Sequence, residues 1–520
     1  MCVYSRTFSF SFVNYDDDEY LYQNRHVMQG LSPQNVAWAF TTTQAGNYHP
    51  LTWLSHMLDV TLFGMNAGAH HAMNVVLHCA NALLLFALVQ KLFGNFFVAA
   101  LVSILFALHP LNVESVAWAS ERKNTLSTLC YFLSLYCYAM YAKEKKRIAY
   151  FGSFFFFLSG LFSKQMLVTM PVVLLMLDLW PLKRGSIDLS KNTKKDTIRV
   201  MTSLVYEKVP FFVCAIIFSV IVYIVQQKGG AVQSFNTISF PDRTAQAFYA
   251  YLQYPVKAVW PVHLAVPYLF QKNLGFPIII CAVLFFITMS ITCSMLYKKV
   301  PHFAFGWWYY VMTLVPVIGL VQIGDQSMAD RYTYITLIGP FVAVGFTLNK
   351  FFSAMKNSRT IKVLFCAVLA VALSAVAYRQ TSYWKDGVTL MRHTVSVTKN
   401  NFRAYNNLGL SLYERGEVDR SIELYRTALA IKPDYTLPYN NLGNSYLSKH
   451  QYDTAAAYFI AAIRLDPHFT QAHNGLGVAY YSRGDVGSAV AEFKEALRAN
   501  PDYESPRRNL DAILSNGAAR

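Results

Sequence analysis

The sequence contains few charged residues for its length. Charged residues make up 14% of the 520 residues, whereas about a quarter of a soluble domain is charged. Hydrophobic residues make up 54% and aromatic residues 15%, and the mean hydropathy is +0.28. These proportions exclude a chain built from soluble domains alone and indicate that much of it faces lipid.

Several signatures of common enzymes and a disulfide framework are also missing. There is no Walker loop, no GxGxxG and no GxSxG motif, which argues against nucleotide chemistry and against an ordinary serine hydrolase. Seven of the eight cysteines lie in apolar runs, Cys2 being the exception, and none follows Cys366. A donor substrate is therefore expected to reach the protein from the membrane.

The net charge of +16 belongs to the apolar part of the chain. Residues 1–379 contain 29 Lys and Arg against 15 Asp and Glu, whereas residues 380–520 contain 16 against 14. This distribution excludes a basic nucleic-acid-binding tail, and we expect no nucleic acid as a partner.

Long apolar stretches alternate with short polar breaks across the first three quarters of the chain. A helix needs about 20 residues to cross the hydrocarbon core, and some of these stretches are shorter. The shortest, 96–109 and 148–163, are the weakest predictions. Ten membrane-spanning segments are predicted: 71–93, 96–109, 124–142, 148–163, 166–182, 207–226, 276–297, 303–323, 332–349 and 361–379.

Loop charges give the expected orientation. Four loops (143–147, 183–199, 298–299 and 350–362) together carry 16 Lys and Arg, and the ten spans place all four on one side, which the positive-inside rule makes cytoplasmic. The opposite side receives residues 14–70, 110–123, 227–275, 324–331 and everything after 379. Ten crossings place both termini outside, so we expect that a first helix is missing from this version of the sequence; an unusual terminus is the alternative.

A repeat of 34 residues begins near Phe402. A similar pattern of Tyr or His, Leu, Gly, small residues, an aromatic ring and Pro recurs over residues 402–435, 436–469 and 470–503. This is the tetratricopeptide pattern, in which small residues lie where paired helices touch and proline ends the second helix. Residues 504–515 are predicted to form a capping helix. Such stacks have a concave surface that holds extended peptide, although a spacer or oligomerisation unit is the alternative.

The first outer loop carries four consecutive acids, Asp16, Asp17, Asp18 and Glu19. Carboxylates this close repel one another, which raises at least one pKa and favours a role as general base. The same oxygens suit a divalent ion, and a solvated acidic turn is the third interpretation.

Histidines follow in the same outer region, at positions that include His49, His56, His70, His71 and His78. They resemble metal ligands in type, but no HExxH or comparable spacing is present. Polar packing and hydrogen bonding to a substrate are therefore favoured over a zinc site, and whether a metal is needed is left open.

Four basic residues lie on the outer face against the usual trend of loop charge: Arg122, Lys123, Lys164 and Arg331. Each alone is explained by snorkelling or by a neighbouring acid. Together they predict a phosphate site, since guanidinium and ammonium groups bind anionic headgroups.

With these residues the chain resembles the family of transmembrane and tetratricopeptide-repeat O-mannosyltransferases and their bacterial relatives, which are membrane glycosyltransferases of the GT-C class. The resemblance rests on the stretches 12–17, 47–59 and 109–123, the last being the most specific, and on the repeats after the last span. The few repeats suggest a bacterial source. Only 13 residues precede Asn14, where GT-C enzymes have a spanning helix.

The resemblance implies transfer of a sugar from a polyprenyl-phosphate carrier to a Ser or Thr hydroxyl of an exported protein. It places the catalytic base on Asp16 or Asp17, with the choice within Asp16–Glu19 open. We expect the four cations to bind the donor phosphate. The predicted sugar and acceptor pocket is lined by His49, Trp53, His71, Glu114 and Trp118.

The predicted fold is all-α: a polytopic GT-C-like helical bundle followed by a tetratricopeptide α-solenoid. Its parts are an outer loop over 1–70, a spanning region over 71–380 and repeats over 381–520, and its expected partners are membrane lipid, the lipid-linked sugar and an acceptor protein. The expected location is the bacterial plasma membrane with the acidic loop and repeats in the periplasm, or the ER membrane with lumenal repeats in a eukaryote. The alternative function is a non-catalytic membrane-anchored scaffold.

Overall fold

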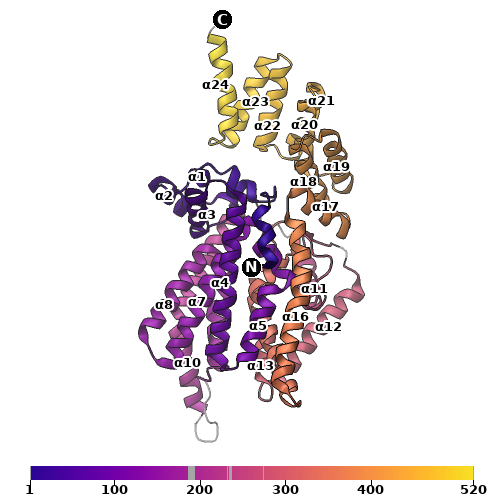
Figure 1. Ribbon diagram of the computed structural model, residues 1–520. Coiled ribbons are helices and arrows are strands. Elements are labelled where there is room, and N and C mark those ends of the chain that lie inside the picture. The colour runs from indigo at the N-terminus through magenta and orange to yellow at the C-terminus, as the bar shows by residue number, and fades with distance from the viewer. Residues whose placement is uncertain (1, 185–193, 231, 233–236, 273, 519–520) are drawn as a thin grey trace. The chain divides into compact units, whose positions relative to one another are not determined.

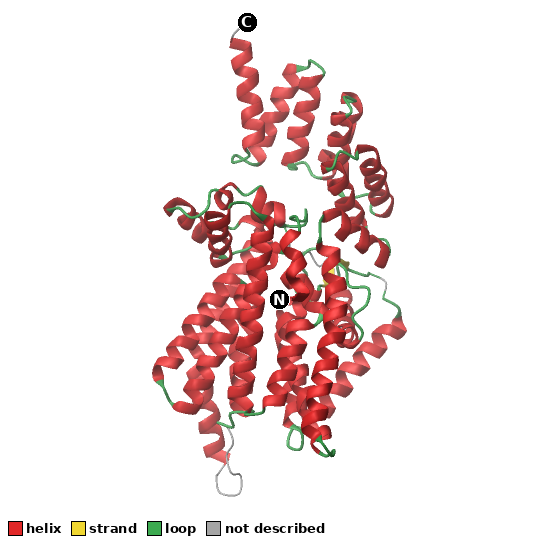
Figure 2. Ribbon diagram, viewed as in Figure 1, coloured by secondary structure: helices red, strands yellow, loops and turns green. Residues whose placement is uncertain are grey.

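The computed structural model describes residues 2–184, 194–230, 232, 237–272 and 274–518. The chain forms two compact units, Met1–Asp386 and Gly387–Arg520, and each is described by itself. Both consist almost entirely of helices, and two short strands lie in the first unit (Figure 2).

The first unit begins with short helices that gather at one end of a helical bundle (Figure 1). Tyr20, Val27, Trp53 and Met57 form their buried core. Pro50 opens α3 at its first turn, where the missing N–H costs nothing. These elements are η2 Asp18–Tyr22, α1 Arg25–Met28, α2 Pro33–Thr41, η3 Gln44–Gly46 and α3 Pro50–Phe63. The helix η1 Cys2–Ser9 precedes them and packs against the long helices 67–93 and 358–381.

Long helices then run side by side to form the bundle (Figure 1). The turn between the first two shows how the sequence sets their ends: α4 ends at Gly94 with φ of 67°, and the Asn95 side chain accepts from Val98 N to begin α5. The long helices are α4 Ala67–Phe93, α5 Phe96–Leu108, α7 Arg122–Glu144, α8 Arg147–Ser163, α9 Met170–Leu179, α10 Lys194–Lys228, α11 Phe240–Val259, α12 Phe276–Met295, α13 Pro301–Leu314, α15 Ile338–Ser353 and α16 Ser358–Thr381.

Short elements connect these helices, and several of them carry the site described below. Two strands, β1 Tyr268–Leu269 and β2 Gln326–Met328, pair antiparallel. The short helices are η4 Pro110–Asn112, α6 Val113–Ala117, η5 Ala119–Glu121, η6 Gln165–Thr169, η7 Val315–Val317, η8 Asp330–Tyr332, α14 Thr333–Thr336 and η9 Ser382–Trp384.

Each of the ten predicted spans contains helix, but fewer satisfy the length and hydropathy of a complete span. Among the described residues four helices do so, over 67–93, 198–228, 276–295 and 358–384, and two bent pairs (96–117 and 330–353) raise the number to six. The other apolar helices, α8 and η6–α9, are shorter than a full crossing. The protein is thus a multi-pass membrane protein by composition, and ten crossings remain a prediction.

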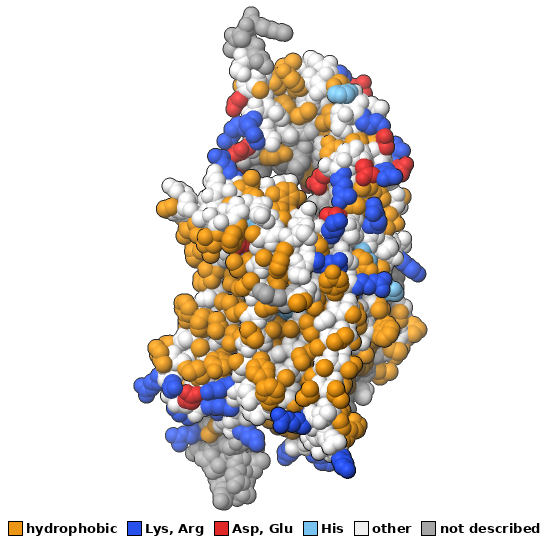
Figure 3. All heavy atoms as spheres, viewed as in Figure 1, with side chains coloured by type: hydrophobic (Ala, Val, Ile, Leu, Met, Phe, Trp, Pro, Cys, Tyr) orange, Lys and Arg blue, Asp and Glu red, His pale blue; other side chains and the backbone are white. Residues whose placement is uncertain are grey.

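Side chains on the bundle surface agree with a membrane environment. Hydrophobic side chains cover the flanks of the helices, and Lys and Arg gather at the end that carries the α7–α8 turn (Figure 3). Exposed apolar side chains include Leu83, Phe151, Ile216, Leu284 and Val371. Such a surface is stable when lipid rather than water covers it.

The second unit is a stack of antiparallel helix pairs, as the 34-residue period predicts. At Gly409, Gly443 and Gly477 an added Cβ would lie 2.6–2.7 Å from the ring of Tyr425, Phe459 or Phe493. Glycine is therefore required where the helices of a pair touch, and the tetratricopeptide prediction is confirmed. The helices are α17 Gly387–Val397, α18 Phe402–Glu414, α19 Val418–Ile431, α20 Thr436–Ser448, α21 Tyr452–Leu465, α22 Thr470–Ser482, α23 Val486–Ala499 and α24 Glu504–Ala518.

Candidate functional site

Asp17 fastens the acidic loop to the second outer loop. Its carboxylate is fully buried and accepts hydrogen bonds from Val13 N and Ser120 N, each at 2.9 Å, and from Ser120 Oγ. Burial raises the pKa of Asp17 to about 7, while the hydrogen bonds from Ser120 and Val13 oppose that rise. Oδ1 holds the two loops together through Ser120, whereas Oδ2 accepts from Val13 within the acidic loop itself.

Asp16 is the acid of the predicted pair that solvent reaches. Its side chain is 42% exposed, and its Oδ2 lies 3.8 Å from Lys123 Nζ. The φ of Asp16 is 69°, a left-handed conformation that Asp tolerates better than most residues. Two consecutive acids thus occupy different environments, one inside the protein and one beside a cation.

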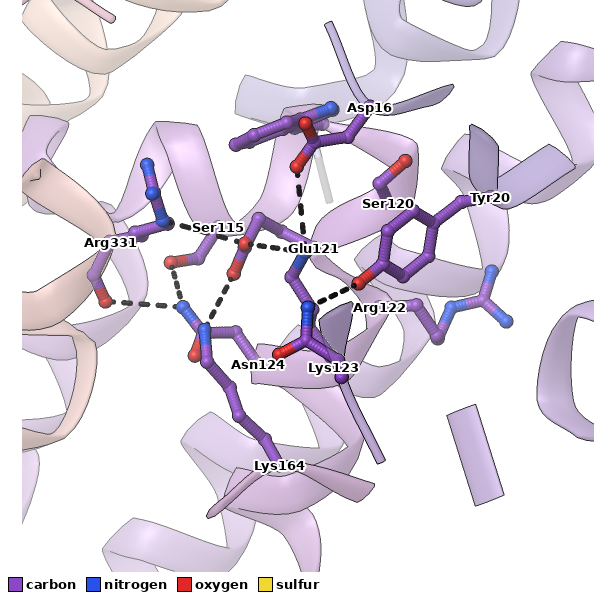
Figure 4. Close-up of polar contacts among 12 residues, drawn as sticks. Asp16, Tyr20, Ser115, Ser120, Glu121, Arg122, Lys123, Asn124, Lys164 and Arg331 are labelled. Carbon is purple, nitrogen blue, oxygen red and sulfur yellow. Dashed lines mark hydrogen bonds and ion pairs between the residues drawn. The ribbon is translucent and has the colours of Figure 1, made fainter. Parts of the chain in front are cut away.

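Three of the four predicted cations meet around one carboxylate, that of Glu121 (Figure 4). Lys164 Nζ donates to Glu121 Oε2 at 3.0 Å. Lys123 Nζ and Arg331 Nε lie 3.4 Å and 3.5 Å from Oε1. These residues come from distant parts of the chain: Glu121 ends η5, Lys123 lies in the first turn of α7, Lys164 follows α8 and Arg331 lies in η8.

The charges of this cluster depend on one another. Although burial alone would raise it, Lys164, Lys123 and Arg331 lower the pKa of Glu121 to about 2. Burial lowers the pKa of Lys164 to about 8, and Glu121 partly opposes that fall. For Lys123 burial acts downward, but Tyr20, Glu121 and Asp16 raise its pKa above the ordinary value. Glu121 is therefore ionised at neutral pH, and Lys164 is mostly protonated there and loses its proton near pH 8.

A second carboxylate orients Arg331. Glu114 Oε1 accepts from Arg331 Nη1 and Oε2 accepts from Arg331 N at 3.0 Å, while Gln326 Oε1 accepts from Nη2 at 2.9 Å. Asn124 Nδ2 donates to the Arg331 carbonyl at 3.1 Å. The guanidinium also lies 5.4 Å from the ring of Trp118. Glu114 and Trp118 thus position the Arg331 cation. The prediction from sequence had placed them in the lining of a sugar and acceptor pocket instead.

Arg122 does not join the other three cations, which corrects the prediction that four converge. Its guanidinium is fully buried and points away from Glu121 (Figure 4). It donates to Asn74 Oδ1, to Ser55 Oγ at 2.8 Å, and through Nη2 to Asp59 Oδ2 at 2.7 Å and the His70 carbonyl at 2.9 Å. Because its N–H donors are occupied by these acceptors, Arg122 fits a structural role better than a role in binding phosphate.

The aromatic residues predicted to line a pocket lie in the packed wall beside the cluster. His49 and Trp53 stack on Tyr20 with ring centroids 5.4 Å and 4.8 Å apart, and Lys123 Nζ lies 4.3 Å from the centre of the Tyr20 ring. His71 lies elsewhere and bonds the Ser11 carbonyl at 3.4 Å. The four predicted pocket rings are each at most 2% exposed: His49, Trp53, His71 and Trp118. They therefore support the site as buried packing and do not line an open surface.

The prediction from sequence missed several residues that hold the cluster. The ring of Tyr20 packs against the Lys123 ammonium group, and Ser120 donates to Asp17. Glu121 forms ion pairs with the cations. The sequence did offer a signal for Glu121 and Ser120 in the second predicted outer loop: they directly precede the two cations Arg122 and Lys123. Asn124 and Gln326 carry no comparable signal, since single amides are common in loops.

The arrangement suits an anionic ligand beside an exposed carboxylate. Lys123, Lys164 and Arg331 contribute three positive charges, and Glu121, Glu114 and Asp16 contribute three negative ones. These three carboxylates therefore balance the three cations. Asp16 is the most exposed of the three, at 42% against 1% for Glu121 and 4% for Glu114.

Comparison with known families places the repeats. A tetratricopeptide-repeat family model matches residues 440–504, and a second repeat model matches residues 409–449. The human RPAP3 first tetratricopeptide domain is 18% identical with a TM-score of 0.22, covering 23% of this chain and 93% of its own. The Sgt2 tetratricopeptide domain from Aspergillus fumigatus is 22% identical with a TM-score of 0.22, covering 23% of this chain and 80% of its own.

Comparison with curated proteins extends over the first unit as well. Human "Protein O-mannosyl-transferase TMTC4" is 21% identical over 475 residues, which is 81% of this chain and 64% of that protein. Caenorhabditis elegans "Protein O-mannosyl-transferase F38B6.6" is 22% identical over 412 residues, 75% of this chain and 54% of that protein. Mouse "Protein O-mannosyl-transferase TMTC1" is 38% identical over 98 residues, 19% of this chain and 10% of that protein.

The chain therefore spans less than two thirds of the length of these curated relatives. Their names and the repeat models confirm the predicted resemblance to the tetratricopeptide-containing O-mannosyltransferases. The predicted all-α fold, a membrane bundle followed by repeats, is confirmed as well.

Proposed function

We propose that the protein is a membrane glycosyltransferase that moves a sugar, mannose by analogy with its relatives, from a polyprenyl-phosphate carrier to a Ser or Thr hydroxyl of an exported protein. The observation that carries this proposal is the cluster of Lys123, Lys164 and Arg331 beside the exposed carboxylate of Asp16. The names of the relatives support the same class of reaction.

The proposed donor site is the face of the cluster that Asp16 covers. Lys123 contacts carboxylates at 3.4 Å and 3.8 Å, distances longer than a hydrogen bond, so a phosphate oxygen competes well for its N–H donors. Lys164 and Arg331 supply further positive charge. Cations placed where a phosphate leaves stabilise the negative charge that develops on it.

Asp16 is the better candidate for the base. A base has to come within hydrogen-bond reach of the acceptor hydroxyl, and the side chain of Asp16 is exposed whereas that of Asp17 is buried and bonded. When phosphate binds Lys123, it displaces the Asp16 carboxylate from that cation. The carboxylate is then available to the acceptor at the moment the donor is in place.

A single displacement suffices for the reaction. The Asp16 carboxylate takes the proton of the acceptor hydroxyl, and the acceptor oxygen forms a bond to the anomeric carbon of the sugar. The bond between that carbon and the phosphate oxygen breaks, and the phosphate leaves with the electron pair. The product has inverted configuration, and no covalent intermediate on the protein is needed.

The proposed partner of the repeats is the acceptor. Tetratricopeptide stacks offer a concave surface that holds extended peptide, and the family models cover residues 409–504. We propose that the acidic loop and the repeats face the periplasm, or the ER lumen in a eukaryote. Protease added to sealed inverted membranes, in which the cytoplasmic side faces outward, should then leave residues 387–520 intact; their digestion would contradict this topology.

The test of the reaction uses the purified full chain with a polyprenyl-phosphate mannose and a Ser/Thr peptide. Asp16→Asn should lower transfer at least 100-fold, since a general base contributes about 10²–10⁴-fold. Glu19→Gln is the matched control, because Glu19 is an exposed acid of the same run, and it should retain transfer within a few-fold.

Binding of the donor separates the two roles in this site. Asp16→Asn should bind the polyprenyl phosphate as tightly as the wild type or more tightly, because it removes a competing carboxylate. Lys164→Met should weaken that binding. Unchanged transfer in Asp16→Asn, or unchanged binding in Lys164→Met, contradicts the proposal, and a chain without any transfer or donor binding would favour the scaffold function.

A further inference from the structure

Two histidines and an aspartate come together behind the acidic loop. His56 and Asp59 lie three residues apart on one face of α3, and His70 lies in the first turns of α4. Nitrogen and oxygen atoms of the three side chains lie within 4.8 Å of one another. All three residues are at most 1% exposed.

The imidazole of His56 has buried polar atoms without partners. Among the residues that the structure describes, neither Nδ1 nor Nε2 of His56 has a hydrogen-bond partner, and both atoms are inaccessible to solvent. A buried polar atom in that condition costs free energy unless something binds it.

The spacing of the other two ligand atoms matches a metal site. His70 Nδ1 lies 3.4 Å from Asp59 Oδ2, and the two ring centroids of His56 and His70 are 5.8 Å apart. Ligands at about 2.0–2.1 Å from a tetrahedral zinc ion lie roughly 3.3–3.4 Å from each other. His70 and Asp59 already have this spacing, and a nitrogen of His56 lies within 4.8 Å of both ligand atoms.

We propose that His56, Asp59 and His70 form a structural site for a divalent transition-metal ion, with Zn²⁺ as the preferred ion. Two neutral imidazoles and one carboxylate are a ligand set that Zn²⁺ and its neighbours bind, whereas Mg²⁺ and Ca²⁺ prefer oxygen. The spacing of residues along the chain does not reveal this triad, because two of its ligands come from α3 and one comes from α4.

Arg122 acts as the outer partner of this site. Its Nη2 donates to Asp59 Oδ2 at 2.7 Å, which orients the carboxylate as second-layer groups do in metal sites. The three side chains leave the fourth position of a tetrahedral ion to a water molecule. The ion then connects α3, α4 and the start of α7.

The position of the site explains what the ion would stabilise. The ring of Phe12, which precedes the acidic loop, packs on His70 with centroids 5.6 Å apart in an edge-on contact. The buried triad has no access to a substrate, so the ion stabilises the platform under the acidic loop and takes no part in transfer.

The test measures metal in the purified full chain, prepared without chelators and without affinity tags that bind metal. The wild type should contain about one zinc per chain, and His56→Ala and His70→Ala should each lower that content at least tenfold. His78→Ala is the matched control: His78 is a buried histidine, but its ring nitrogens bond the Tyr334 hydroxyl at 2.7 Å and the Ala107 carbonyl at 3.0 Å. It should retain the metal.

A second measurement keeps the proposal falsifiable if the alanine variants fold poorly. Wild type stripped with a chelator should regain thermal stability with Zn²⁺ or Co²⁺ but not with Mg²⁺, and the cobalt form should show the visible absorption of tetrahedral Co²⁺. Wild type with less than a tenth of an equivalent of metal and no response to Zn²⁺ or Co²⁺ overturns the site. Equal metal in wild type and His56→Ala overturns it as well.

Discussion

Replacing Glu121 with Gln tests whether one buried carboxylate holds the cation cluster together. Glu121 is 1% exposed and lies 3.0–3.5 Å from Lys164, Lys123 and Arg331. Gln has the same size and lacks the charge. The substitution therefore leaves three cations, whose side chains are 10–14% exposed, without their shared partner.

Two estimates of the loss agree. The pKa of Glu121 falls from 4.5 to about 2, so ionised Glu121 stabilises the folded state by about 3 kcal/mol. Because the folded pKa is lowered, this stabilisation is present above pH 4.5 and is lost as the pH falls toward 2. Removing one partner of a buried ion pair costs about 3–5 kcal/mol, which covers the same range.

The assay is unfolding in detergent at pH 7 with and without a polyprenyl phosphate. Glu121→Gln should lower the free energy of unfolding by about 3 kcal/mol. It should also gain more stability from polyprenyl phosphate than the wild type does, since the phosphate supplies the missing negative charge. Glu144→Gln, at an exposed ion pair with Lys91, is the control and should change little.

The reasoning fails if Glu121→Gln unfolds within about 0.5 kcal/mol of the wild type, the effect of an ordinary surface substitution. It also fails if the variant is destabilised but polyprenyl phosphate stabilises it no more than the wild type. In that case Glu121 is structural and the cations do not bind phosphate.

Three further predictions follow from buried groups. Asp17→Asn should lower the free energy of unfolding by about 1–3 kcal/mol for each backbone N–H that loses its acceptor. Because burial raises the pKa of Asp17 to about 7, the stability of the wild type should fall as the pH rises toward 7. The variant should lack this dependence on pH. Because burial lowers the pKa of Lys164 to about 8, polyprenyl phosphate should bind more weakly as the pH rises through 8, and Lys164→Arg should bind equally at pH 7 and pH 9. Gly443→Ala places a Cβ 2.6 Å from Phe459 and should destabilise the repeats by about 1–3 kcal/mol in thermal unfolding, whereas Gly487→Ala, with no atom within 4 Å, should not.

The repeats could be predicted from sequence because each of their contacts recurs at a fixed interval. Gly409, Gly443 and Gly477 each meet an aromatic ring of the following helix, so one packing rule accounts for all three. The spanning helices were predicted in position for a similar reason, since apolar length alone defines them. Their number was less certain because α8 and η6–α9 are too short to qualify by themselves.

Lys123, Lys164 and Arg331 were named from sequence as a group of cations, but the carboxylates with which they pair were not predicted. Arg122 and Lys123 are neighbours at the start of a helix, where successive side chains point about 100° apart, so they face different partners. Sequence order shows that both are basic and shows nothing about which carboxylate each one meets. Asp16 and Asp17 also lie in different surroundings although they are adjacent and identical in type, because the left-handed φ of Asp16 separates their side chains.

The pairing of charges also determines what the site can select. Three cations in a site without carboxylates would bind any anion, including the phosphates of lipid headgroups that surround the protein. Glu121 and Glu114 are buried against the cations, whereas Asp16 lies beside Lys123 in an exposed position. In the proposed function, a single phosphate diester charge, which a polyprenyl-phosphate sugar carries, replaces that of Asp16. We propose that selection of that donor over other lipids then rests on the sugar, which has to fit between the cations and the displaced carboxylate.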